Sequence, residues 1–133
     1  YKERASYKDI IKFISRVKQN KIKTLAFIKK NIKLGKKIFL YGASTKGNTL
    51  LQYYGLTNKE IPYAAERTKT KWGKYTVGSG VRIISEENAR KLNPDYFFVM
   101  PYGFIKEFIK REKKWLRSGG KFILPYPHFK ILR

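Results

Sequence analysis

The chain has 133 residues, of which 42% are hydrophobic and 16% aromatic, enough for one folded domain and too many for a disordered segment. It carries 31 Lys and Arg against 9 Asp and Glu, a net charge of +22. It has no cysteine and one histidine, which excludes disulfides, thiolate zinc sites, cysteine nucleophiles and histidine-based metal clusters within these residues.

The positive charge allows two interpretations. A strongly positive field attracts polyanions, so a nucleic-acid-binding module is one hypothesis. The basic residues are mostly lysines spread over nearly every segment, without an arginine-rich tail, which favours a solvated lysine-rich surface. The start does not resemble a signal peptide, and no apolar run approaches the roughly 20 residues that span a bilayer. We expect no membrane partner, a cytoplasmic location and, because the first residue is not Met, a segment of a longer chain.

Helical spacing characterises the first quarter of the chain. Apolar residues recur at this spacing over residues 5–33, and Gly35 ends the pattern as a helix C-cap would. This predicts a helical lead-in arm over residues 1–34, followed by a second unit over residues 35–133.

Short apolar runs alternate with helical patterns in the second unit. Strands are predicted at 37–41, 61–65, 81–84, 95–100 and 121–125, and helices at 47–54, from Ser85 onward and at 104–117. This alternation predicts a mostly parallel sheet with helices on both faces. The predicted fold class is α/β, a small Rossmann-like three-layer domain with an N-terminal helical arm.

The stretch YGASTKGNT, residues 41–49, connects the first strand to the next helix. Its glycines fit neither the phosphate loop, in which Lys follows the second glycine, nor the dinucleotide fingerprint, whose middle glycine is absent. A dinucleotide-dependent oxidoreductase is therefore disfavoured. Ligands of open α/β sheets nevertheless bind at this place, because the helix N-terminus offers unpaired amides and partial positive charge.

The residue types of this loop suit an anion. Two glycines permit a tight turn, three neutral side chains offer hydrogen bonds, and a lysine supplies positive charge. The glycines are Gly42 and Gly47, the neutral side chains are those of Ser44, Thr45 and Asn48, and the lysine is Lys46. No group here is an obvious proton-transfer catalyst. We therefore expect binding without catalysis, and we assign no catalytic and no metal-binding residue.

An acidic residue follows the second strand. Glu66 comes after Gly42 at a spacing close to the roughly 20 residues at which an acid binds ribose hydroxyls, and Arg67 beside it suits a phosphate or a base. Spacing alone leaves two interpretations open: a nucleotide site, or a tight turn capped by Ser44 with Glu66 as a surface acid. Three loop aromatics are candidates for stacking on a base or sugar, namely Trp72, Tyr75 and Tyr102.

Four blocks in the chain resemble the C-terminal domain of the bacterial sugar C-methyltransferase family. They are YGASTKGNTLLQYYGL, KWGKYTVGSGVRIISEE, NPDYFFVMPYGF and RSGGKFILPYP. The resemblance runs from about residue 36 to 127, and the helical arm is similar to the family's lead-in helix. It implies a three-part protein with a zinc-binding N-terminal module, a central S-adenosylmethionine-dependent methyltransferase domain and this Rossmann-like domain. Such proteins methylate a carbon of a nucleotide-linked deoxy-keto-sugar, with the catalytic base in the central domain.

The resemblance also implies roles for individual residues. The residues that it implies should face the pyrophosphate are Gly42, Ala43, Ser44, Lys46, Gly47 and Asn48. A second block implies a loop that covers the nucleotide, with Lys71, Trp72, Gly73 and Tyr75. The chain departs from the family pattern at three places. It has Glu66-Arg67-Thr68 for Asp-Arg-Asn, a less rigid sequence at residues 77–80 for Pro-Gly-Thr-His, and Tyr102 for Trp.

The sequence therefore leads to one main hypothesis and two alternatives. The main hypothesis is a substrate-binding domain of a sugar-nucleotide C-methyltransferase, noncatalytic by itself and without a cofactor of its own. Its expected partners are a nucleotide-linked sugar and a methyltransferase domain in cis or in trans, and S-adenosylmethionine and zinc are implied only for the full-length family. The alternatives are a basic nucleic-acid-binding module and a purely structural support domain.

Overall fold

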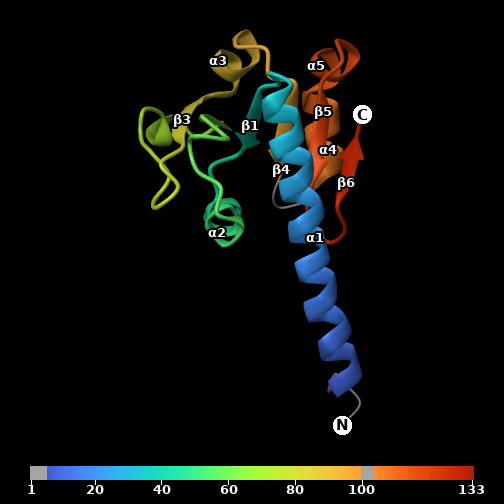
Figure 1. Cartoon of the computed structure of the whole chain (residues 1–133). Coiled ribbons are helices and arrows are strands. Elements are labelled where there is room, and N and C mark those ends of the chain that lie inside the picture. Colours follow the sequence, from blue (N-terminus) through green and yellow to red (C-terminus); the bar gives the residue numbers. More distant parts are fainter. Residues whose placement is uncertain (1–5, 100–103) are drawn as a thin grey trace.

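A computed structural model describes residues 6–99 and 104–133. Six strands form one sheet in the order β3-β2-β1-β4-β5-β6, with β1 to β5 parallel and β6 antiparallel to β5 (Figure 1). The strands are β1 (Ile38–Tyr41), β2 (Tyr63–Glu66), β3 (Arg82–Ser85), β4 (Tyr96–Val99), β5 (Lys121–Leu124) and β6 (Lys130–Leu132). The helices are α1 (Tyr7–Lys33), α2 (Thr45–Tyr54), α3 (Glu86–Lys91), α4 (Ile105–Arg111) and α5 (Lys113–Arg117), with a short 3-10 turn at Lys69–Lys71. The predicted α/β fold with a mostly parallel sheet is confirmed.

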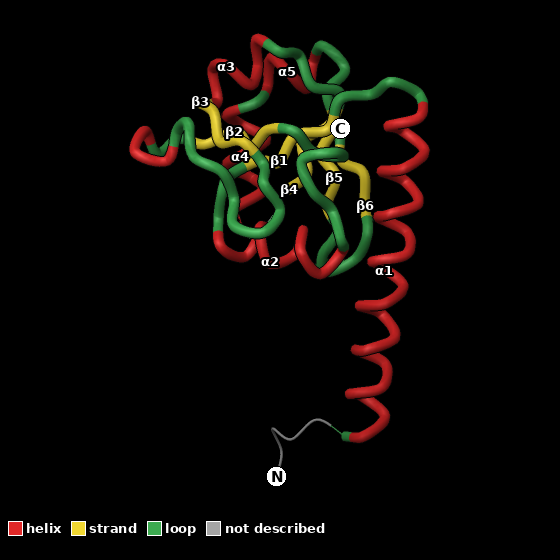
Figure 2. Tube along the Cα trace, turned by 60° about the vertical axis from the view of Figure 1, so that its left-hand side comes forward, coloured by secondary structure: helices red, strands yellow, loops and turns green. Residues whose placement is uncertain are grey.

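Helices cover the two faces of the sheet with different side chains (Figure 2). Residues alternate between the faces along each strand, so β1 contributes Ile38 and Leu40 to one core and Phe39 and Tyr41 to the other. The first core is largely aliphatic and includes residues of α1 and α2, whereas the second is largely aromatic and includes residues of α3, α4 and α5. All four residues of β1 are buried, as the sequence predicted for a strand covered on both sides.

Besides shifts of one or two residues at the strand ends, three features differ from the predictions. Helix α2 begins at Thr45 rather than Gly47, because Ser44 caps it. The helix predicted over 104–117 is two helices that meet at Glu112, whose side chain is drawn into the domain. Strand β6 was not predicted, because its three residues form too short a pattern to recognise.

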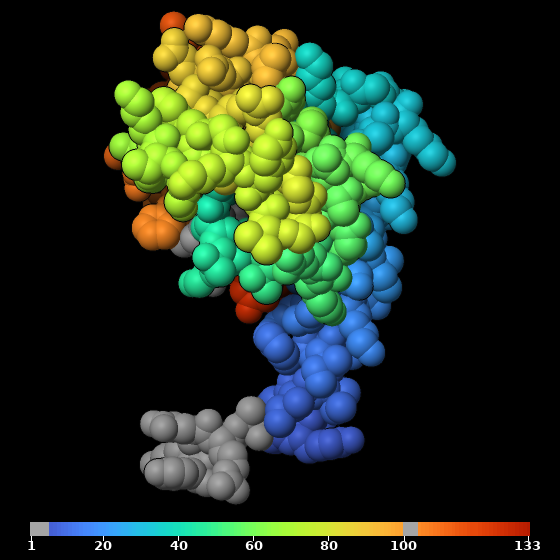
Figure 3. Space-filling model, turned by 90° about the vertical axis from the view of Figure 1, so that its left-hand side faces the viewer, coloured from blue at the N-terminus to red at the C-terminus, as the bar shows by residue number. Residues whose placement is uncertain are grey.

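Helix α1 belongs to the domain at one end and projects from it at the other (Figures 1 and 3). Thr24 and Ile28 are buried, and Asn20 binds the turn after β5 by donating to the Pro127 carbonyl oxygen at 2.7 Å. Near its C-terminus, Asn31 accepts a hydrogen bond from Tyr96, the first residue of β4. The helix therefore runs against the parallel strands, and its N-terminal half extends past their carboxyl ends. None of the described helices is both long and apolar enough to cross a membrane.

Candidate functional site

The loop after β1 is a tight turn into a capped helix. Gly42 has the left-handed φ of 86°, and its amide donates to the Ala65 carbonyl oxygen at 2.7 Å. The Ser44 hydroxyl accepts from the Gly47 amide at 3.0 Å, the capping interaction that the sequence offered as one interpretation. Within the described part of the chain, the amides of Ser44, Thr45 and Lys46 have no hydrogen-bond partner. Such free amides at a helix N-terminus favour an anion.

The carboxylate of Glu66, at the end of β2, stabilises this turn by hydrogen bonds. Its carboxylate accepts from the Ala43 amide at 2.7 Å and from the Thr68 amide at 2.9 Å. Burial alone would raise the pKa of Glu66, but these two hydrogen bonds and the charge of Lys71 lower it below its ordinary value. Only 8% of the residue is exposed, so the interpretation of Glu66 as a surface acid is wrong. An ionised, buried carboxylate fixes the loops after β1 and β2 to each other.

A hollow of about 390 Å³ opens between the start of α2 and the loop of residues 67–80. Its lining includes Ser44, Thr45, Lys71, Lys74 and Tyr75. The Lys71 amine donates to the Ala43 carbonyl oxygen at 3.3 Å, which places its positive charge beside the free amides of α2. Lys74 was not among the predicted site residues, although it belongs to the same KWGKYT block as Lys71 and Tyr75. Two lysines and two residues with free amides, Ser44 and Thr45, therefore line this hollow, a combination suited to an anion.

The 67–80 loop is tied to α2 by side chains. Asn48 donates to the Val77 carbonyl oxygen at 2.8 Å and accepts from the Ser79 hydroxyl at 2.6 Å. Gln52 donates to the same Val77 oxygen at 2.7 Å, and the hydroxyls of Thr76 and Ser79 are 2.5 Å apart. Asn48, predicted to contact a phosphate, thus has its side-chain oxygen and nitrogen engaged in positioning the loop.

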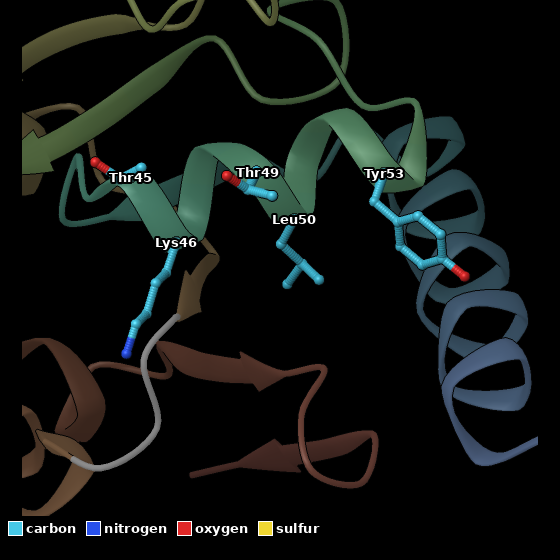
Figure 4. A pocket seen from close by; sticks show the side chains of 5 residues that line it. All are labelled: Thr45, Lys46, Thr49, Leu50 and Tyr53. Atoms are coloured by element: carbon cyan, nitrogen blue, oxygen red, sulfur yellow. The ribbon is translucent and has the colours of Figure 1, made fainter. Parts of the chain in front are cut away.

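The remaining predicted residues lie apart from this hollow. Lys46 lies along a different hollow of about 410 Å³, beside Leu50 and Tyr53 (Figure 4). Arg67 is exposed and pairs with Glu107 at 3.5 Å. Trp72 donates from its indole nitrogen to the Glu66 carbonyl oxygen at 2.8 Å and lines a separate groove with Arg67. Gly73 adopts the left-handed φ of 83° in the 67–80 loop, and Tyr102 lies outside the described residues.

A buried polar network that the sequence did not predict supports the site from the aromatic face. Glu112 is 1% exposed and accepts from Arg90 at 2.8 and 2.6 Å and from the Tyr41 hydroxyl at 2.6 Å. Arg111 donates to the same hydroxyl and to Glu86, each at 3.1 Å. Burial and the adjacent Glu112 carboxylate raise the pKa of Tyr41 well above its ordinary range, so the hydroxyl stays protonated. Tyr41 directly precedes Gly42, so the network anchors the end of β1 from which the turn starts.

Metal-binding groups do not come together in the described residues: nowhere among them do three His, Asp or Glu side chains form a cluster that could hold an ion. Hydrogen-bond donors and positive charge are what the described residues of the hollow offer to a ligand.

Comparison with known proteins identifies the family of the chain. Residues 2–127 match the family described as the C-methyltransferase C-terminal domain. The C-methyltransferase NovU of Streptomyces niveus is 39% identical over 98 residues, which are 74% of this chain and 23% of that protein. The chain thus spans about a quarter of the length of this curated relative. With 126 of its 133 residues inside the family match, the chain belongs to the C-methyltransferase C-terminal domain family.

Proposed function

We propose that this domain binds the diphosphate of a nucleotide-linked sugar and presents the sugar to the catalytic part of a C-methyltransferase. The observation that carries the proposal is the hollow in which the free amides of α2 face Lys71 and Lys74. A diphosphate offers several acceptor oxygens and negative charge, which match amide donors and ammonium groups. Tyr75, 59% exposed at the rim, suits the flat face of a sugar or base.

The arrangement is suited to binding rather than to reaction. Glu66 is the acid nearest the loop, and both of its carboxylate oxygens already accept backbone amides. No residue of the hollow combines a free carboxylate or imidazole with access to a ligand, so proton abstraction from the sugar would be the task of another domain. Glu66 as an acceptor for ribose hydroxyls remains a prediction, as do the roles of Arg67 and Trp72 beside a base.

S-adenosylmethionine does not fit this hollow. The methyl donor carries a positive sulfonium, a positive ammonium and one carboxylate, and is net positive. The hollow presents Lys71 and Lys74, and the buried carboxylate of Glu66 is occupied, so the two cationic groups of the donor have no acceptor there. We assign the methyl donor to the catalytic part of the enzyme, outside these residues. The proposal therefore gives this domain a substrate and no cofactor.

A titration with dTDP, UDP and GDP at about 150 mM salt, followed by backbone amide shifts, tests the proposal. Saturable shifts of the amides at residues 43–48 are expected. The double variant Lys71→Ala/Lys74→Ala is expected to weaken binding on the order of tenfold or more, since each hydrogen bond to a charged group contributes about 1.5–3 kcal/mol.

The matched control is Lys36→Ala/Lys59→Ala, which removes the same charge from exposed positions elsewhere. If both double variants weaken binding equally and the effect disappears with added salt, the field of the whole surface is responsible, as a nucleic-acid-binding module would show. If no nucleotide shifts the amides at residues 43–48, the domain is a structural support and the proposal fails.

A further inference from the structure

The N-terminal half of α1 exposes an apolar face that the described part of the chain leaves uncovered. Ile10, Phe13 and Ile14 are 46%, 46% and 42% exposed, although each is an apolar side chain within a regular helix. Ser6 and Asp9 form a capping box that starts the helix, so these residues belong to an ordered segment. Figure 1 shows this part of α1 projecting well beyond the body of the domain.

This face is the straight continuation of the one that packs on the sheet. Ile10 and Ile28 are 18 residues apart in the sequence, about five turns at about 3.6 residues per turn, so their side chains point the same way. Phe13 stands in the same relation to Asn31, and both Ile28 and Asn31 are buried against the domain. The exposed residues therefore look toward the space below the carboxyl edge of the sheet, and away from open solvent on the outer side of the helix.

The body of the domain supplies a second wall to this space. Helix α2 presents a hollow along Lys46, Leu50 and Tyr53, and Figure 4 shows these side chains on one side of the helix, with Tyr53 next to α1. The Lys21 amine lies 4.6 Å from the centroid of the Tyr53 ring, which joins the two walls at their corner. The inner face of the arm and this side of α2 thus form a concave, partly apolar surface, here called the corner surface.

Charge and shape select the occupant of the corner surface. Two copies of this chain would each bring a net charge of +22, so self-association here is opposed by strong repulsion. A flat lipid bilayer cannot enter a concave angle between an arm and a globule. The cations at the border, Lys21 and Lys46, call for carboxylates around an apolar centre. A folded protein domain with an acidic rim meets all three conditions.

We infer that the corner surface is the docking site for the catalytic part of the C-methyltransferase, which seats an apolar patch on Ile10, Phe13 and Ile14. The family describes this chain as a C-terminal domain, and the chain spans 23% of its curated relative, so members contain a large further part that must contact this one to act on a shared substrate. Because the arm extends past the carboxyl ends of the strands, a domain docked there lies at the same edge of the sheet as the start of α2, where Thr45 lines both hollows. The inference deepens the proposed function and rests on it for the shared substrate.

Thiol footprinting tests the docking. The chain has no cysteine, so single variants Ile10→Cys on the inner face and Ile22→Cys on the outer face each introduce one reporter; Ile22 is 64% exposed. Alkylation is read peptide by peptide in the mass spectrometer, on the chain alone and with the catalytic part present on the same chain or added as a separate one. We expect the thiol at position 10 to react at least tenfold more slowly when the catalytic part is present, and the thiol at position 22 to change less than twofold.

Three outcomes would overturn the inference. Equal reactivity at both positions with the catalytic part present would show that nothing docks on the inner face. Protection of position 10 in the chain alone, increasing with its concentration, would assign the face to a second copy. Protection that requires vesicles of phosphatidylcholine and phosphatidylglycerol would assign it to lipid. Amide shifts on titration with a nucleotide report on the hollow alone, so failure of the docking and failure of the proposed function remain distinguishable.

Discussion

Two buried carboxylates, Glu66 and Glu112, hold two different regions of this domain, and they do so in different ways. Glu66 accepts two backbone amides and ties together the loops after β1 and β2. Glu112 accepts side-chain donors from Arg90 and Tyr41 and ties α4 and α5 to the sheet. The donors to Glu66 belong to the backbone and remain in place whatever the surrounding side chains are. The Tyr41 hydroxyl, by contrast, is buried and loses its acceptor with Glu112, while Arg90 loses one of its two acidic partners. The two regions should therefore respond differently to the same kind of substitution.

The largest effect is expected for Glu112→Ala. Removal of the carboxylate takes the acceptor from the buried Tyr41 hydroxyl and one of two ion-pair partners from Arg90, which keeps Glu86 and is 37% exposed. Breaking a fully buried ion pair from one side costs about 3–5 kcal/mol, and solvent screening at Arg90 lowers the expected loss to about 2–4 kcal/mol. Urea denaturation measures the loss. Glu107→Ala is the control, because Glu107 pairs with Arg67 and Arg111 at the surface and should cost less than about 1 kcal/mol. Similar losses for the two variants would show that the Glu112 network does not stabilise the fold.

Glu66→Gln is expected to cost about 1–3 kcal/mol at pH 7, since the amide group accepts with one oxygen instead of two and lacks the charge. The pKa of Glu66 is lowered in the folded protein, so its contribution is complete above the unfolded pKa, about 4.3, and is lost as pH falls through the folded pKa. The difference between the variant and the native chain should therefore shrink toward pH 3. Glu87→Gln, at an exposed position, should show no such convergence, and a pH-independent difference for Glu66→Gln would contradict its role as an ionised acceptor.

Asn48→Ala should have a smaller effect, about 1 kcal/mol for the hydrogen bonds to the 67–80 loop. Its clearest sign is local, because the amides of Gly80 and Val81 bond within the loop that Asn48 holds. Their hydrogen exchange should accelerate while exchange in β1 and β4 stays unchanged. Asn88→Ala, at an exposed position of α3, serves as the control, and equal exchange in both variants would show that Asn48 does not hold the loop.

The smallest effect is expected for Ile10→Ala in the chain alone. An exposed side chain with no partner in the described structure should change stability by less than about 0.5 kcal/mol. Ile28→Ala, the same substitution five turns later and fully buried, should cost about 2–5 kcal/mol. Comparable losses for the two isoleucines in thermal unfolding would mean that the projecting half of α1 is already covered in the isolated chain.

The α/β architecture could be predicted from the sequence because its strands are apolar throughout and alternate with helical patterns. Helix and strand boundaries that depend on a single side chain could not be predicted. Glu112 lies on a face of the 104–117 pattern that reads as solvent-exposed helix, and only the distant Arg90 and Tyr41 explain why it turns inward and separates α4 from α5. Strand β6 pairs with β5 through three residues, too few for alternation to be visible.

The sequence predicted which residue types the candidate site contains, but it did not predict how these residues are arranged. Local spacing placed Ser44 and Thr45 at a helix N-terminus, and there the structure agrees. Spacing could not show on which side of α2 a lysine projects, and Lys46 lies along a different hollow from Lys71 and Lys74. Nor could it show that Glu66 accepts the Ala43 amide, because that bond depends on the parallel pairing of β1 with β2.

The hydrogen bonds between Asn48 and the 67–80 loop bear on how selectivity could evolve. Asn48 and Ser79 fix the far end of the loop, the Glu66–Thr68 contact fixes its start, and Trp72 is bound to the Glu66 carbonyl oxygen. Between these anchors, the exposed side chains of Lys74 and Tyr75 are the ones that can vary. Substitutions there would alter the shape and charge of the hollow while the sheet beneath stays intact. Under the proposed function, exchange of Lys74 and Tyr75 between family members should change the preference for the nucleotide or sugar without redesign of the core.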